Sequence, residues 1–110
     1  SLYELVVLAT LSDGAMHGYQ IGLEVVERSN GLFVLQHGTL YPVLHRLEGA
    51  GLIRGRWSQP KGERKRKVYE VTAAGRRHLA GEGDWARKVF EGFLEALHGD
   101  DGVRAAAGAG

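Results

Sequence analysis

Two stretches of the sequence carry side chains whose types and spacing could do chemistry. The first is GTLYPVLHRLEG at 38–49, whose hydrogen-bond donors are Thr39, Tyr41, His45 and Arg46. The second, 54–67, holds seven of the chain's 14 lysines and arginines and only one acid, Glu63. Hydroxyl, imidazole and guanidinium groups are the donors that proteins offer to phosphates and base edges. Both stretches are therefore candidates for contact with a polyanion.

The apolar residues of the first stretch predict a helix over 37–49. Leu40, Val43, Leu44 and Leu47 follow the i, i+3, i+4, i+7 spacing of one buried helix face. The opposite face then presents Thr39, Tyr41, Pro42, His45 and Arg46. Pro42 lies near the front of this helix, where its missing N–H costs little. We expect Tyr41 to face outward as a phosphate donor; the alternatives are that Tyr41 belongs to the core and that His45 is only solvated.

The cations of the second stretch lie in a predicted β-hairpin. Residues 52–59 and 65–72 alternate in polarity, and PKGE at 60–63 is a turn cluster. Alternation favours Lys61, Arg64 and Arg66 as the cations that reach a polyanion, with Lys65 and Lys67 on the other face, although a register slip of one residue inverts that assignment. The alternative is a hairpin whose charges are merely solvated.

The order of the elements predicts a winged helix-turn-helix, a mainly α fold with a small β-hairpin. Helices are expected over 2–12 and 17–29, with His17 as a capping or packing residue, followed by a strand stub or buried connector at 32–35. Thr72 is expected to cap a short helix over 73–82, and a glycine-containing break at 81–83 separates it from a last helix. The predicted organisation is a DNA-binding domain over 1–80, a dimerisation helix over 81–98 and a flexible tail over 99–110.

Catalysis and metal binding find no support in the sequence. There is no cysteine, no serine in a nucleophile motif and no phosphate-binding glycine loop. The five histidines lack metal-ligand spacing. We expect no enzymatic activity, no cofactor and no metal. No apolar run is long enough for a membrane span, and the absence of cysteine fits a cytoplasmic protein.

The last helix carries an apolar band that needs a cover. Its residues include Val89, Phe90, Phe93, Leu94 and Leu97. The cover is either the chain's own first helix or the same helix of a second chain, and the second option predicts a homodimer. Trp85, at the start of this helix, either packs in that interface or stacks on a small planar aromatic ligand.

Taken together, these stretches resemble the PadR family of transcriptional regulators. The resemblance rests on HGYQI at 17–21, GTLYPVLHRLEGAGLI at 38–53, Trp57 and KVYEVTAAGRRHL at 67–79. It implies a homodimeric winged-helix repressor that binds operator DNA and is released by a small-molecule effector, in the subfamily with a single C-terminal dimerisation helix. Trp85 matches the position at which multidrug-binding members stack planar ligands. Where the family often has a capping Ser before the third helix, this chain has Gln36, a poorer cap, and His37 then becomes a further candidate for phosphate contact.

The expected function is sequence-specific binding of double-stranded DNA by a transcriptional regulator, as a repressor with a small-molecule effector. The alternative is a ligand- or protein-binding winged-helix module that does not bind DNA.

Overall fold

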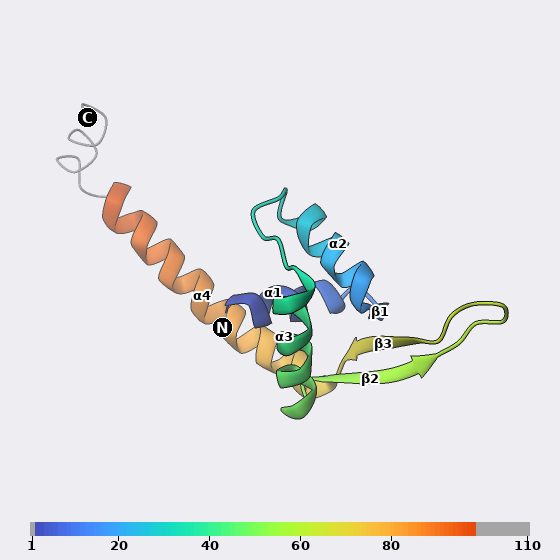
Figure 1. Ribbon diagram of the computed structural model, residues 1–110. Helices are drawn as coiled ribbons and strands as arrows, with labels where there is room; N and C mark the ends of the chain where they lie inside the picture. The colour runs from blue at the N-terminus through green and yellow to red at the C-terminus, as the bar shows by residue number, and fades with distance from the viewer. Residues whose placement is uncertain (1, 99–110) are drawn as a thin grey trace. The chain divides into compact units, whose positions relative to one another are not determined.

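Three helices and a three-stranded sheet precede one long C-terminal helix (Figure 1). The computed structural model describes residues 2–98, and the tail predicted for 99–110 lies outside the described residues. The elements are α1 (Leu2–Leu11), β1 (Met16–His17), α2 (Gly18–Arg28), α3 (His37–Gly49), β2 (Ile53–Ser58), β3 (Arg66–Val71) and α4 (Ala73–His98). The chain divides into two compact units, 1–80 and a second that begins at Gly81. The first three predicted helices and the hairpin are confirmed, as is the mainly α fold.

The core of the first unit lies between the three helices and the sheet. The stripe predicted on α3 is buried throughout, and each of its four side chains is at most 2% exposed. Apolar residues from every element of the unit before α4 join it, because each helix places one face inward. The buried apolar residues are Val7, Leu8, Leu11, Met16, Ile21, Val25, Leu35, Leu40, Val43, Leu44, Leu47, Ile53 and Tyr69.

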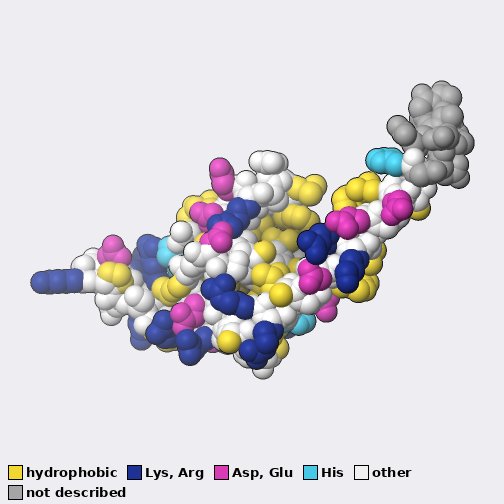
Figure 2. Space-filling model, turned by 180° about the vertical axis from the view of Figure 1, so that it is seen from behind, with side chains coloured by type: hydrophobic (Ala, Val, Ile, Leu, Met, Phe, Trp, Pro, Cys, Tyr) yellow, Lys and Arg dark blue, Asp and Glu magenta, His cyan; other side chains and the backbone are white. Residues whose placement is uncertain are grey.

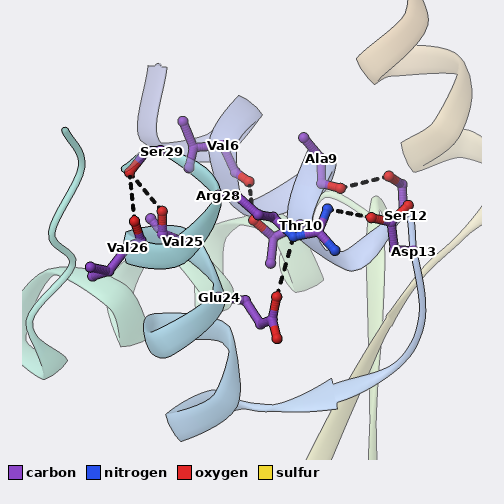
Figure 3. Close-up of polar contacts among 10 residues, drawn as sticks. All are labelled: Val6, Ala9, Thr10, Ser12, Asp13, Glu24, Val25, Val26, Arg28 and Ser29. Carbon is purple, nitrogen blue, oxygen red and sulfur yellow. Dashed lines mark hydrogen bonds and ion pairs between the residues drawn. The ribbon is translucent and has the colours of Figure 1, made fainter. Parts of the chain in front are cut away.

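Polar side chains at the edge of this core bond within α1 and within α2, and join α2 to the turn after α1 (Figure 3). The buried Thr10 hydroxyl donates to the Val6 carbonyl at 2.8 Å, so that it carries no unpaired donor into the interior. Arg28, in the last turn of α2, forms ion pairs with Asp13 and, at 3.4 Å, with Glu24. The pair with Asp13 ties the end of α2 to the turn that follows α1.

The segment 32–35 is a connector and forms no strand. The Phe33 N–H bonds to the Ser29 hydroxyl at 3.0 Å rather than to a neighbouring strand. Leu35 is buried and Phe33 half-buried, whereas Leu32 and Val34 are exposed. Of the two interpretations left open for this stretch, the connector is correct, although only part of it is buried.

The sheet contains a strand that the sequence did not predict. Its order is β1–β3–β2, all antiparallel. In β1, Met16 pairs with Tyr69 and His17 with Val68, whereas β2 and β3 pair over their full six residues. A two-residue strand shows no alternation of its own, so only its partner reveals it. Its consequence is that the start of α2 is held against the hairpin.

The predicted break at 81–83 is wrong, because α4 is one helix from Ala73 to His98. Thr72 caps its start as predicted: the Thr72 hydroxyl accepts from the Gly75 N–H at 3.0 Å and donates to the Gly51 carbonyl at 2.7 Å. Each helical glycine costs only about 1 kcal/mol relative to alanine. The strong helix formers around Gly81 and Gly83 therefore outweigh them. Within residues 2–98, no helix is long and apolar enough to cross a bilayer.

Candidate nucleic-acid interface

A pocket of about 450 Å³ lies between the start of α2, α3 and the hairpin. No acidic side chain lines it. Its walls are four consecutive cations, four aromatic rings, one histidine and one glycine: Arg64, Lys65, Arg66, Lys67, Tyr19, Tyr41, Trp57, Tyr69, His17 and Gly18. Lys and Arg side chains gather over the hairpin, toward the left in Figure 2. Convergent cations bind the phosphates of a nucleic acid, and aromatic faces can stack on its bases.

Tyr41 forms the α3 wall of this pocket. A Cβ atom on Gly18 would lie 2.6 Å from the Tyr41 hydroxyl oxygen, so the tyrosine can lie where it does only because residue 18 is a glycine. The Tyr41 side chain is 42% exposed, and its ring centroid is 5.5 Å from that of His37. Tyr41 thus lies outside the core, with its hydroxyl against the start of α2.

The end of the hairpin does not keep the predicted separation of its cations. Lys65 and Lys67 line the pocket together with Arg64 and Arg66. Strand pairing ends at Ser58 and Arg66, so the alternation rule does not govern Arg64 or Lys65, which precede the strand. Lys65 Nζ instead lies 5.2 Å from the Trp57 ring centroid, a cation–π distance.

Carboxylates neutralise three of the seven hairpin cations. Glu70 accepts from Arg54 at 2.6 Å and from Arg56 at 3.1 Å, and these arginines lower the pKa of the Glu70 carboxyl. Glu48 of α3 pairs with Lys67 at 3.0 Å and also accepts from the Gly55 N–H at 3.2 Å. Among residues 2–98, no carboxylate pairs with the remaining four, which are Lys61, Arg64, Lys65 and Arg66. Lys61 lies in the turn and outside the pocket lining.

The outer face of α3 is mostly exposed, but one of its side chains bonds to α1. Thr39, Pro42 and His45 are exposed, as predicted. Arg46, on the flank toward α1, donates from Nε to Glu4 Oε1 at 3.0 Å, and this hydrogen bond lowers the Glu4 pKa. Arg46 is therefore part of an ion pair across 42 residues of sequence, which the helix pattern alone did not indicate.

The start of α3 has the weak cap that the sequence indicated. Gln36 adopts the extended N-cap conformation, and its side chain makes no capping hydrogen bond. Pro42 lies within the helix, which continues unbroken to Gly49. Of the two roles predicted for His17, capping or packing, the structure shows capping, because His17 Nδ1 accepts from the Gln20 N–H at 3.2 Å.

Besides the two lysines, sequence reasoning gave no binding role to five lining residues of the pocket: His17, Gly18, Tyr19, Trp57 and Tyr69. Alternation assigns Trp57 to the same face as the buried Ile53, yet its ring is 64% exposed. Gly18 and Tyr19 belong to the HGYQI stretch, which contributed only to the family resemblance. Their position at the pocket follows from the pairing of β1 with β3, a long-range contact with no local signal.

In the second unit, α4 exposes the predicted apolar band (Figure 2). Val89, Phe90 and Phe93 are each more than half exposed, Leu97 is 37% exposed, and Leu94 is half-buried. Trp85 is 64% exposed. Across the described part of the chain, no group of three His, Asp or Glu side chains could hold a metal ion.

Three helices followed by a hairpin, with a basic pocket between the third helix and the hairpin, define a winged helix-turn-helix protein. The family model of the "Transcriptional regulator PadR-like family" matches residues 7–81. The chain is also 37% identical over 73 residues to Transcriptional regulator Rv3488 of Mycobacterium tuberculosis, covering 66% of this chain and 64% of that protein.

Solved structures agree with this match. A PadR family transcription regulator from Clostridium difficile superposes with a TM-score of 0.69 at 30% identity, covering 86% of this chain and 99% of the other. Bacillus subtilis PadR in complex with operator DNA gives 0.67 at 26% identity, covering 78% of this chain and 47% of the other. The chain belongs to the PadR-like family of transcriptional regulators. It is a regulator of transcription rather than an enzyme.

Proposed function

We propose that this chain is a homodimeric repressor that binds operator DNA through α3 and the hairpin and is released by a small planar aromatic effector. The observation that carries the proposal is the pocket between these elements, which holds four cations and no acid. The Bacillus subtilis relative solved with operator DNA supports the choice of partner. Residues 1–80 then form the DNA-binding domain and 81–98 the dimerisation helix, in a cytoplasmic protein with access to DNA.

In this proposal α3 enters the major groove and the hairpin is the wing. Thr39, Pro42 and His45 are exposed on α3, and Tyr41 lies on the flank toward the wing. We assign Tyr41 and Thr39 to phosphates, and His45 and Arg46 to base edges. We assign Lys61, Arg64 and Arg66 to phosphates of the DNA backbone, since they have no carboxylate partner among the described residues.

The salt dependence of DNA affinity tests this assignment. A labelled duplex of the promoter next to the chain's own gene is titrated at several salt concentrations and followed by fluorescence anisotropy. Several phosphate contacts predict a steep fall in affinity, and Arg64→Gln should make the slope of log K against log salt shallower by about 0.9 for each protomer, or about 1.8 for the dimer. Arg54→Gln is the matched control, because Arg54 is already paired with Glu70, and its slope should equal that of the wild type. A flat salt response of the wild type would overturn DNA binding and favour the alternative, a winged-helix module that binds ligands or proteins only.

The exposed band of α4 supports the dimer. Three large apolar side chains that are more than half exposed on one helix are a recurrent mark of an interaction surface. A two-fold dimer would present two copies of α3 to a two-fold DNA site. Light scattering should give a dimer for the wild type and a monomer for Phe93→Glu; a wild-type monomer at micromolar concentration would overturn this assignment.

The exposure of Trp85 supports the proposal of a planar aromatic effector. Its indole is 64% exposed on the same helix, where a planar molecule can stack on it. Planar aromatic compounds should quench Trp85 fluorescence and lower the affinity for the promoter duplex. Trp57 supplies the other tryptophan signal, so quenching is measured in the Trp57→Phe variant. DNA affinity is measured with the wild type, because Trp57 lines the pocket. Quenching without any loss of DNA affinity would contradict release by an effector.

A further inference from the structure

Each ring nitrogen of His17 faces a hydrogen-bond donor. His17 Nδ1 lies 3.2 Å from the Gln20 backbone nitrogen, and His17 Nε2 lies 3.1 Å from Arg66 Nη1. Both neighbours are N–H donors, and a guanidinium has no acceptor atom. A neutral imidazole has only one acceptor nitrogen, so only one of the two contacts is a hydrogen bond.

The start of α2 decides which contact that is. The Gln20 N–H belongs to the first turn of the helix and has no partner within the helix. A capping hydrogen bond there stabilises a helix by about 1 kcal/mol. Arg66 is exposed and hydrogen-bonds to water without loss. The cap therefore places the imidazole proton on Nε2, and that N–H points at another donor, the Arg66 guanidinium.

Both groups line the same pocket. We propose that His17 Nε2–H and the Arg66 guanidinium together bind one phosphate oxygen of the DNA backbone. A single anionic oxygen within reach of both accepts from each of them and leaves the Gln20 cap intact, so that all three donors have a partner. No acid lines the pocket to take that place. The inference rests on the proposed function. It adds a neutral histidine as a phosphate donor, and the capping hydrogen bond at Nδ1 determines that Nε2 carries the donated proton.

Two substitutions separate the cap of His17 from its donor. In His17→Asn, the amide oxygen still accepts from the Gln20 N–H, as asparagine does at an N-cap, but the distal donor is lost. In His17→Gln, the longer amide retains a donor near the Nε2 position and loses the cap. The His17→Asn variant should therefore keep the wild-type melting temperature and bind DNA roughly tenfold more weakly for each protomer, as expected for a hydrogen bond to a charged group. The His17→Gln variant should melt at a lower temperature and keep most of the affinity.

The salt slope distinguishes a neutral donor from a cation. With a fluorescein-labelled duplex of random sequence, Arg66→Gln should make the slope shallower by about 0.9 for each protomer, or about 1.8 for the proposed dimer, because each protomer loses one phosphate contact. His17→Asn should weaken binding equally at every salt concentration, with the slope unchanged, because a neutral imidazole releases no counterion. A shallower slope for His17→Asn would overturn the assignment of a neutral Nε2–H donor.

A double-mutant cycle tests whether the two residues share one phosphate. The affinity loss of His17→Asn should be several-fold smaller in the Arg66→Gln background than in the wild type. Lys61→Gln is the matched control, because Lys61 lies outside the pocket, and its effect should add to that of His17→Asn. Additive losses for His17 and Arg66 would contradict a shared phosphate.

Nitrogen NMR of the histidine ring reads the tautomer directly. The free protein should show protonation at Nε2, and the Nε2 resonance should shift on addition of the duplex but not on addition of inorganic phosphate at the same concentration. Protonation at Nδ1, or an equal shift with inorganic phosphate, would overturn the proposal. If the wild type binds no duplex at all, the proposed function fails as well. If it binds with a steep salt slope while His17→Asn binds like the wild type, only the inference about His17 fails.

Discussion

Lys67 of the hairpin and Glu48 of α3 form an ion pair in which Lys67 Nζ lies 3.0 Å from Glu48 Oε1. Both side chains are about one-third exposed. Glu48 also accepts from the Gly55 N–H, so one carboxylate joins α3 to both strands of the hairpin. The pair therefore fixes the hairpin relative to the helix that forms the opposite wall of the pocket.

This pair should contribute to stability over a defined range of pH. The Lys67 hydrogen bond lowers the pKa of Glu48 below 4.5, and Glu48 raises the pKa of Lys67 above 10.5. The contribution of Glu48 is present above its unfolded pKa and is lost as the pH falls through the lowered folded value. That of Lys67 is present below its unfolded pKa and is lost as the pH rises through the raised value.

A Glu48→Gln, Lys67→Gln double-mutant cycle by urea unfolding should give a coupling of about 0.5 kcal/mol at neutral pH, since the pair is partly exposed. The coupling should vanish in strong acid. Arg87 and Asp84 on α4 provide the control: they are 3.1 Å apart, but both side chains are 64% exposed. Equal coupling for the two pairs would contradict a special role for Glu48.

Gly75 and Gly18 should respond differently to alanine. A Cβ on Gly75 would lie 2.0 Å from the Leu52 carbonyl oxygen, which belongs to fixed backbone, so Gly75→Ala should cost about 1–3 kcal/mol of stability. A Cβ on Gly18 meets the end of the Tyr41 side chain, which can swing away. Gly18→Ala should thus unfold at nearly the wild-type urea concentration while DNA affinity falls. If Gly18→Ala bound DNA as tightly as the wild type, the position of Tyr41 would be irrelevant to binding.

Thr72 should be replaceable by serine but not by alanine. Its hydroxyl caps α4 and also donates to the Gly51 carbonyl. Thr72→Ala should cost about 1 kcal/mol, a fall of roughly 4–8 °C in melting temperature for a domain of this size. Thr72→Ser retains the hydroxyl and should melt close to the wild-type temperature. Circular dichroism melts measure both, and equal losses would show that the methyl group, and not the cap, stabilises the helix.

Arg46 should affect which bases are preferred more than overall affinity. To reach a base edge, its guanidinium must leave Glu4, whose Oε1 lies 3.0 Å away. Selection of bound sequences from a random duplex library should give a different preferred site for Arg46→Ala. Arg64→Ala should instead weaken all sequences alike. An unchanged preferred site for Arg46→Ala would make the Glu4 ion pair the main role of this arginine.

The sequence by itself determined the features that depend on neighbours along the chain. The bounds of α3, its buried stripe, the weak cap at Gln36 and the caps at His17 and Thr72 all follow from helical periodicity and local hydrogen bonding. The same local rules mispredicted a break in α4, because they gave Gly81 and Gly83 more weight than the helix formers around them.

Only the tertiary structure decided which of the candidate side chains meet. The contact of His17 with Arg66 spans 49 residues of sequence and that of Arg46 with Glu4 spans 42. The pairing of β1 with β3 brings the start of α2 to the hairpin, and no periodic pattern encodes a two-residue strand. Periodicity assigns a side chain to a face, whereas its partner depends on how the faces pack. The pocket therefore exists only in the folded chain.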